Sequence, residues 1–127
     1  MAHIVIIEDD PLIRHCVVSA LQVEGHEVSS AANGIEAVTL WRGKAPDLVI
    51  TDLFMPECDG IEVIAALQRS HPETPIIAIS GHSARPGLFL KVAERLGAQT
   101  TLQKPFSADE LFSTVNSVLG RPVRLTP

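Results

Sequence analysis

Asp52 is the residue whose position most clearly predicts chemistry. It follows the apolar run of residues 48–51 and precedes a loop marked by Pro56. A carboxylate at the C-terminal end of a buried strand lies at the mouth of an α/β sheet, where ligands bind. Three other strand-like runs deliver polar groups to the same edge, and these groups are Glu8-Asp9-Asp10, Ser80 and Lys104. Acids, a hydroxyl and an amine around one carboxylate indicate phosphoryl chemistry on that carboxylate.

Length and composition narrow the classes of protein. A chain of 127 residues with 46% hydrophobic residues is most simply one domain with a single covered core. The net charge of -5 argues against general attraction to nucleic acid or to an anionic membrane. We find no apolar run near the roughly 20 residues of a membrane span, and no signal peptide. The two cysteines fit no metal-binding spacing, and two thiols in a chain without a visible secretion signal are expected to be reduced and cytoplasmic.

Short β-like runs alternate with helical patterns along the chain. We expect strands at residues 4–7, 27–31, 48–51, 76–79 and 100–103, each followed by a helix. Right-handed crossovers between five such units place helices on both faces of a parallel sheet. A barrel of eight units would need about 250 residues, so the sequence predicts an open α/β sheet.

Capping residues and apolar stripes define the helices. Asp10 before Pro11 is a helix N-cap, and Ser107 with Glu110 forms a capping-box pattern. The fourth helix is predicted over residues 88–96. Apolar residues at helical spacing predict the buried faces of the first two helices. They are Leu12, Ile13, Cys16, Val17, Ala20 and Leu21 in the first helix, and Ile35, Val38 and Trp41 in the second.

Four motifs in order resemble the receiver domain of two-component response regulators, the CheY-like family. They are Glu8-Asp9-Asp10, then Asp52 with Met55-Pro56 and Asp59-Gly60, then Ser80-Gly81, and last Lys104-Pro105-Phe106. The resemblance implies a flavodoxin-like (βα)5 fold whose parallel strands follow the order 2-1-3-4-5. It assigns residues 1–120 to the receiver domain, and residues 121–127, with two prolines, are expected to be a flexible tail.

The resemblance also implies a role for each polar residue at the sheet edge. Asp52 would be the phosphoacceptor, and Lys104 and Ser80 would contact the phosphoryl oxygens. Asp9, Asp52 and the backbone carbonyl of Phe54 would bind Mg²⁺ or Mn²⁺, and Glu8 would act through metal-bound water. Clustered carboxylates favour such a cation. Asp10 is left with the capping role because it directly precedes a proline.

The function implied is a phosphoacceptor switch of a two-component phosphorelay. The phosphodonor would be a sensor histidine kinase or a histidine phosphotransfer protein, and the output would be a downstream protein or an output domain. The chain would promote its own phosphorylation and dephosphorylation without being an enzyme for another substrate. Direct nucleic-acid binding and membrane association are not expected.

Two alternatives remain open on the sequence. One is a Mg²⁺-dependent phosphatase of the aspartyl-phosphate type, although such enzymes usually carry a second Asp where this chain has Phe54. The other is a degenerate receiver used only for protein binding. The chain also departs from many receivers in having Thr101 where an aromatic residue often stands, three positions before Lys104. We further hypothesise that the Phe54 ring shields the acyl phosphate from water and prolongs its lifetime.

Overall fold

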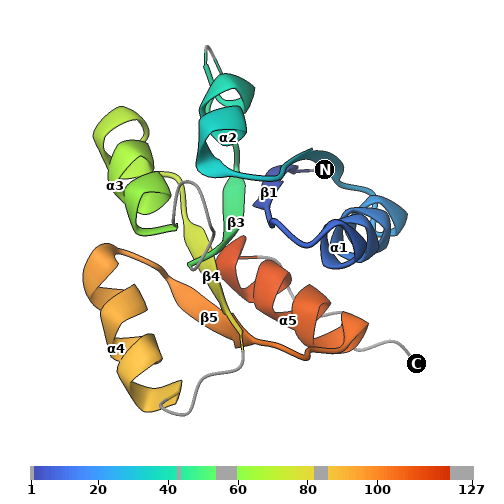
Figure 1. The fold of residues 1–127 in the computed structure, drawn as a ribbon. Coiled ribbons are helices and arrows are strands. Elements are labelled where there is room, and N and C mark those ends of the chain that lie inside the picture. Colours follow the sequence, from blue (N-terminus) through green and yellow to red (C-terminus); the bar gives the residue numbers. More distant parts are fainter. Residues whose placement is uncertain (1, 43, 54–59, 82–85, 121–127) are drawn as a thin grey trace.

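A computed structural model describes residues 2–42, 44–53, 60–81 and 86–120, with only the backbone given for residues 60, 61 and 86–90. Five strands and five helices alternate in this part of the chain (Figure 1). The strands are β1 (His3–Ile7), β2 (Glu27–Ala31), β3 (Leu48–Asp52), β4 (Ile76–Ser80) and β5 (Thr100–Gln103). The helices are α1 (Pro11–Val23), α2 (Gly34–Leu40), α3 (Gly60–Ser70), α4 (Pro86–Leu96) and α5 (Ala108–Val118).

The five strands form one parallel sheet of order β2-β1-β3-β4-β5, which confirms the predicted fold class. The register pairs Ile7 with Thr51, Asp52 with Ile79, and Ser80 with Gln103. The last residues of β1, β3, β4 and β5 are therefore neighbours. Polar groups at these strand ends must converge on one edge of the sheet.

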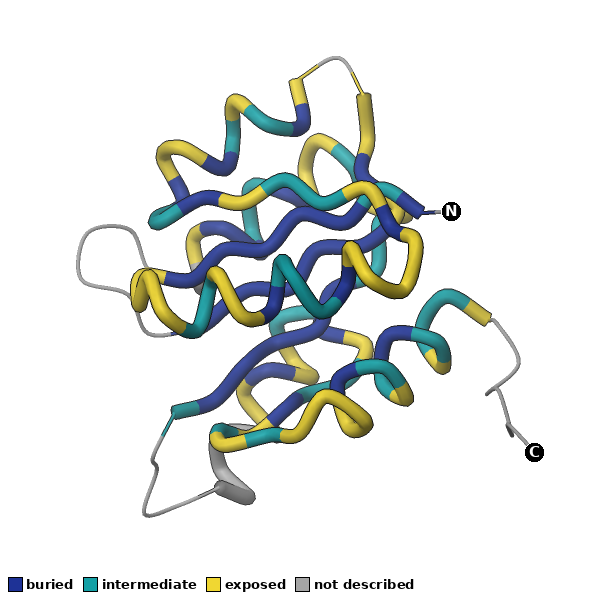
Figure 2. Tube along the Cα trace, turned by 90° about the vertical axis from the view of Figure 1, so that its right-hand side faces the viewer, coloured by how far each residue is buried: buried dark blue, intermediate teal, exposed yellow. Residues whose placement is uncertain are grey.

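Helices cover both faces of the sheet, with α1 and α5 on one side and α2, α3 and α4 on the other (Figure 1). Side chains of a strand alternate between the faces, so Ile4 and Ile6 pack under α1 and α5 while Val5 and Ile7 pack under the other three helices. The central strands β1, β3 and β4 are buried almost throughout, whereas the edge strands β2 and β5 are only partly buried. The outer helix surfaces are exposed (Figure 2). Both faces being covered explains why the strands read as continuous apolar runs.

Local interactions place the ends of α1 and the start of α5 where the sequence predicts them. The Asp10 carboxylate accepts hydrogen bonds from the backbone N–H groups of Leu12 and Ile13, and the Ser107 hydroxyl accepts one from the Glu110 N–H. Gly25 follows α1 with a φ of 92°, a conformation that favours glycine. Asp10 and Ser107 thus fix the points at which the chain leaves the functional edge of the sheet, and Gly25 ends α1 at the opposite edge, where β2 begins.

Four details of the helices were predicted wrongly, and one of them is Cys16 of α1, which is exposed rather than buried. Ile35 is 67% exposed rather than on the inner face of α2, because Ala37 and Trp41 occupy that face. Leu12 is 70% exposed, because the apolar stripe of α1 is wider than the face that Val17 and Leu21 bury. Helix α4 begins at Pro86, two residues earlier than expected, which is a position that proline favours.

Candidate functional site

Four elements deliver the polar side chains of the site. Glu8 follows β1, Asp52 and Ser80 are the last residues of β3 and β4, and Lys104 follows β5. Since the strands are parallel and adjacent, the predicted edge does bring these residues together. Glu8, Asp52 and Ser80 are buried, whereas Asp9 is exposed. The site is therefore a partly buried cluster of polar side chains with one carboxylate at its exposed side.

Lys104 is shared between two carboxylates. Its Nζ lies 3.0 Å from Asp52 Oδ2 and 2.5 Å from Glu8 Oε1, and the second contact is one that the sequence did not reveal. The backbone helps to aim this side chain, because the Lys104 N–H donates to the Ser80 carbonyl at 2.8 Å. The Lys104–Pro105 peptide bond is cis. The ammonium thus bridges the predicted phosphoacceptor and the buried acid of β1.

Glu8 is held at several atoms. Its backbone N–H donates to the Ala31 carbonyl at 3.1 Å, and its Oε2 accepts from the Asp10 N–H at 3.2 Å. Its backbone carbonyl accepts a hydrogen bond of 2.8 Å from Nη1 of Arg14. With Oε1 on Lys104, both carboxylate oxygens and both backbone groups of Glu8 have partners. These partners fix the orientation of the buried Glu8 carboxylate before any ligand binds.

Burial raises the pKa of Glu8 from its ordinary value of 4.5 to about 7. The hydrogen bonds from Lys104 and the Asp10 N–H lower this pKa, while the Asp9 hydrogen bond and the Asp52 charge raise it. Burial of the ammonium lowers the pKa of Lys104, but the hydrogen bonds and charges of Glu8 and Asp52 outweigh this, so the pKa is raised. The ammonium stays charged at neutral pH, and Glu8 changes charge near neutrality.

The acids of the site fit a divalent cation. Carboxylate oxygens of Glu8, Asp9 and Asp52 lie within 4.8 Å of one another. Hard oxygen ligands of this kind suit Mg²⁺ or Mn²⁺, and one ammonium does not neutralise three carboxylates. Two acids are buried and one is exposed, so the cluster also has an open side. The Phe54 carbonyl, expected to be a further ligand, lies outside the described residues.

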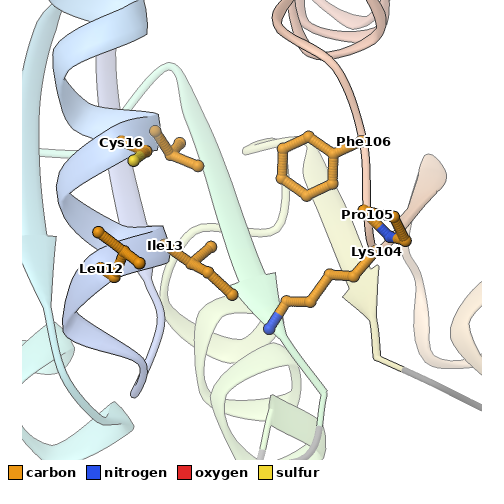
Figure 3. Close-up of a pocket in the computed structure, with 7 residues that line it drawn as sticks. Leu12, Ile13, Cys16, Lys104, Pro105 and Phe106 are labelled. Carbon is orange, nitrogen blue, oxygen red and sulfur yellow. The ribbon is translucent and has the colours of Figure 1, made fainter.

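An apolar groove adjoins the site between α1 and the segment that links β5 to α5. It has a volume of about 500 Å³ and is lined by Leu12, Ile13, Cys16, Val17, Lys104, Pro105 and Phe106. In Figure 3 the side chains of α1 face those of residues 104–106 across this groove. Sequence reasoning missed it because Leu12 and Cys16 were assigned to the core, whereas both are exposed. An unpaired apolar surface thus lies next to the reactive edge.

Fold and site together define a receiver of the kind that signalling proteins use. The family profile described as the response regulator receiver domain matches residues 4–116, and the chain belongs to this family. In the part of the chain that the structure describes, we find no helix long and apolar enough to cross a membrane.

Several known proteins are similar to this chain. The transcriptional regulatory protein TcrA of Mycobacterium tuberculosis is 34% identical over 93% of the chain and 46% of its own length. The transcriptional regulatory protein GlrR of Escherichia coli is 31% identical over 98% of the chain and 28% of its own length. The chain therefore spans less than half of either relative. The solved receiver domain of NtrX from Brucella abortus is 31% identical, with a TM-score of 0.86 over 94% of this chain and 99% of that one.

Proposed function

We propose that this chain is a phosphoacceptor switch in which Asp52 receives a phosphoryl group. The observation that supports this most directly is the Lys104 ammonium, which lies 3.0 Å from the Asp52 carboxylate beside a cluster of further acids. Phosphoryl transfer depends on positioning and on neutralising the charge of the phosphoryl oxygens. An amine, a buried hydroxyl and a cation-binding cluster around one carboxylate meet both requirements.

The reaction is a transfer from nitrogen to oxygen. A carboxylate oxygen of Asp52 forms a bond to phosphorus, while the bond from phosphorus to a donor histidine nitrogen breaks. The imidazole leaves with that electron pair, and the product is an aspartyl phosphate. When bound, Mg²⁺ or Mn²⁺ supplies positive charge that offsets the phosphoryl oxygens. Asp9 and Asp52 are the described residues that would hold it, and Glu8 would act through metal-bound water.

The remaining residues bind and orient the phosphoryl group. Lys104 leaves its ion pairs with the two acids and contacts a phosphoryl oxygen. The ammonium therefore has a negatively charged partner both before and after phosphorylation. The Ser80 hydroxyl donates a hydrogen bond to another phosphoryl oxygen, and it stands on the strand beside Asp52. These contacts differ between the free and the phosphorylated carboxylate, so phosphorylation can shift a conformational equilibrium.

The partners follow from this chemistry. The phosphodonor would be a sensor histidine kinase or a histidine phosphotransfer protein in the cytoplasm. A donor histidine that reaches Asp52 brings its surrounding surface close to the neighbouring apolar groove, so we propose that the donor protein packs against Leu12 and Ile13. The longer relatives favour an output through a further domain, and a separate downstream protein is the other possibility. No direct nucleic-acid binding by this domain is proposed.

Intact-mass measurement tests the proposal. The protein is incubated with Mg²⁺ and acetyl phosphate, and the expected result is one added phosphoryl group that Asp52→Asn abolishes. Asp109→Asn, an exposed acid in the first turn of α5, is the matched control and should behave as the wild type. Release of phosphate over many rapid turnovers would instead indicate a phosphatase. A folded protein that forms no adduct would indicate a receiver used only for binding.

A further inference from the structure

Arg14 reaches back from α1 to the acidic turn. It lies in the second turn of the helix and is half-buried. Its Nη1 donates a hydrogen bond of 2.8 Å to the backbone carbonyl of Glu8. The strand ladder of β1 ends at Ile7 on both sides, where Ile7 pairs with Ala31 and with Thr51. The Glu8 carbonyl thus lies beyond the ladder, and the guanidinium supplies a donor to it.

This carbonyl belongs to the peptide group that joins Glu8 to Asp9. A peptide group is planar, so fixing its oxygen fixes the plane that connects the two residues. Rotation of that plane would turn both side chains relative to each other. The Glu8 carboxylate has little freedom to adapt, because one oxygen is on Lys104 and the other accepts from the Asp10 N–H. The direction of this one peptide group therefore matters for the whole acidic cluster.

We propose that Arg14 is a positioning residue of the acidic site, which holds the Glu8–Asp9 peptide group so that both carboxylates converge with Asp52. This inference rests on the proposed function, because it concerns the cation that the site would bind. The guanidinium suits the task because its donors have a fixed planar arrangement, unlike those of a flexible ammonium. Arg14 touches neither the phosphoryl group nor the cation in this role.

The positive charge of Arg14, considered alone, predicts the opposite effect on cation affinity. A positive group near a cation site repels the cation, so removing the charge of Arg14 would tighten binding if repulsion dominated. If positioning dominates, removing the same group weakens binding, because outer partners of metal ligands typically contribute about tenfold or more to metal affinity. The sign of the change in cation affinity therefore separates the two roles of Arg14.

Calorimetric titration of the full chain with Mg²⁺ measures this sign. We expect Arg14→Gln to weaken Mg²⁺ binding by about tenfold, and Arg14→Lys to recover part of the loss. Arg69→Gln is the matched control, because Arg69 is exposed in the last turn of α3. Its affinity should equal that of the wild type. Thermal melting of each variant sets a temperature at which all of them are folded during the titration.

A double substitution tests whether Arg14 acts through Glu8. In the Glu8→Gln background, Arg14→Gln should weaken Mg²⁺ binding less than it does in the wild type, since coupled residues are not additive. Equal or tighter binding by Arg14→Gln alone, or fully additive losses, would overturn the inference while leaving the proposed function intact. A wild type that binds no Mg²⁺ and forms no adduct would remove the proposed function itself.

Discussion

The buried carboxyl of Glu8 makes cation binding depend on pH in a way that can be calculated. With a pKa of about 7, Glu8 is protonated when the solution is more acidic and ionised when it is more alkaline. Its ionised fraction is about 0.9 at pH 8 and about 0.1 at pH 6. If the cation binds the ionised form, its apparent affinity falls about tenfold across this range, which corresponds to about 1.4 kcal/mol.

Proton release gives a second measure of the same event. A cation that binds at pH 6 must displace about 0.9 proton from Glu8, whereas at pH 8 it displaces about 0.1. Mg²⁺ titrations in buffers of different ionisation enthalpy count these protons directly. Glu8→Gln keeps the size of the side chain and removes the titration, so this variant should bind Mg²⁺ more weakly and release almost no proton at either pH.

Two results would contradict this role of Glu8. A Glu8→Gln protein with the same pH dependence as the wild type would show that another group titrates. A wild type that releases no proton at pH 6 would show that the Glu8 carboxyl is not protonated there or does not respond to the cation. Asp109→Asn serves as the control, because an exposed acid on α5 should leave both the affinity and the proton count unchanged.

Four further predictions concern separate features of the molecule. Lys104→Met should slow formation of the aspartyl phosphate yet tighten Mg²⁺ binding by about tenfold, because the competing ammonium is gone; weaker binding in calorimetry would contradict this. Leu12→Arg should reduce phosphotransfer from a phosphorylated kinase but not from acetyl phosphate, with stability changed by about 0.5 kcal/mol or less, since the side chain is 70% exposed; equal losses with both donors would count against a docking role. Gly97→Ala should lower the free energy of unfolding in urea by about 1 kcal/mol or more, because the φ of 109° disfavours a side chain and the new Cβ would meet the Gln68 side chain; an unchanged midpoint would refute it. Phe54→Asn should speed autodephosphorylation by admitting water, and a decay as slow as that of the wild type would dismiss the shielding hypothesis.

Glu8 also affects folding in the absence of a cation. Its pKa is higher in the folded protein than in the unfolded chain, so the folded state holds the proton more tightly. The resulting stability is fully present below about pH 4.5 and is lost as the pH rises through about 7. The raised pKa of Lys104 works at the alkaline end, since its contribution is lost only as the pH rises above the ordinary value of 10.5.

Much of the fold could be predicted because the central strands β1, β3 and β4 are apolar runs with polar residues at their C-terminal ends. The change from apolar to polar residues is clear at the end of β1, where Glu8 follows Ile7. It is equally clear at the end of β3, where Asp52 follows soon after Ile50. Parallel strands then bring their carboxyl ends together without any need for detailed packing. The strand order came from the family resemblance, because apolar runs alone do not fix the order of neighbours.

What the sequence did not reveal depends on side-chain reach in three dimensions. Glu8 and Lys104 are 96 positions apart in sequence, and no spacing indicates that the ammonium would sit between this acid and Asp52. Leu12 was misassigned because an apolar residue at helical spacing looks the same whether a core or a groove lies beside it. Arg14 has no signal at all, since one arginine in a helix is most often a solvated surface residue.

The packing of α5 has a consequence for synthesis on the ribosome. Leu111 and Val115 of this last helix fill the same core as Ile4 and Ile6 of the first strand. That face of the sheet therefore stays incompletely covered until the final helix leaves the exit tunnel, long after its first strand has emerged. A nascent chain of this kind exposes apolar strand surface until α5 has emerged, and such exposed surface is prone to aggregation.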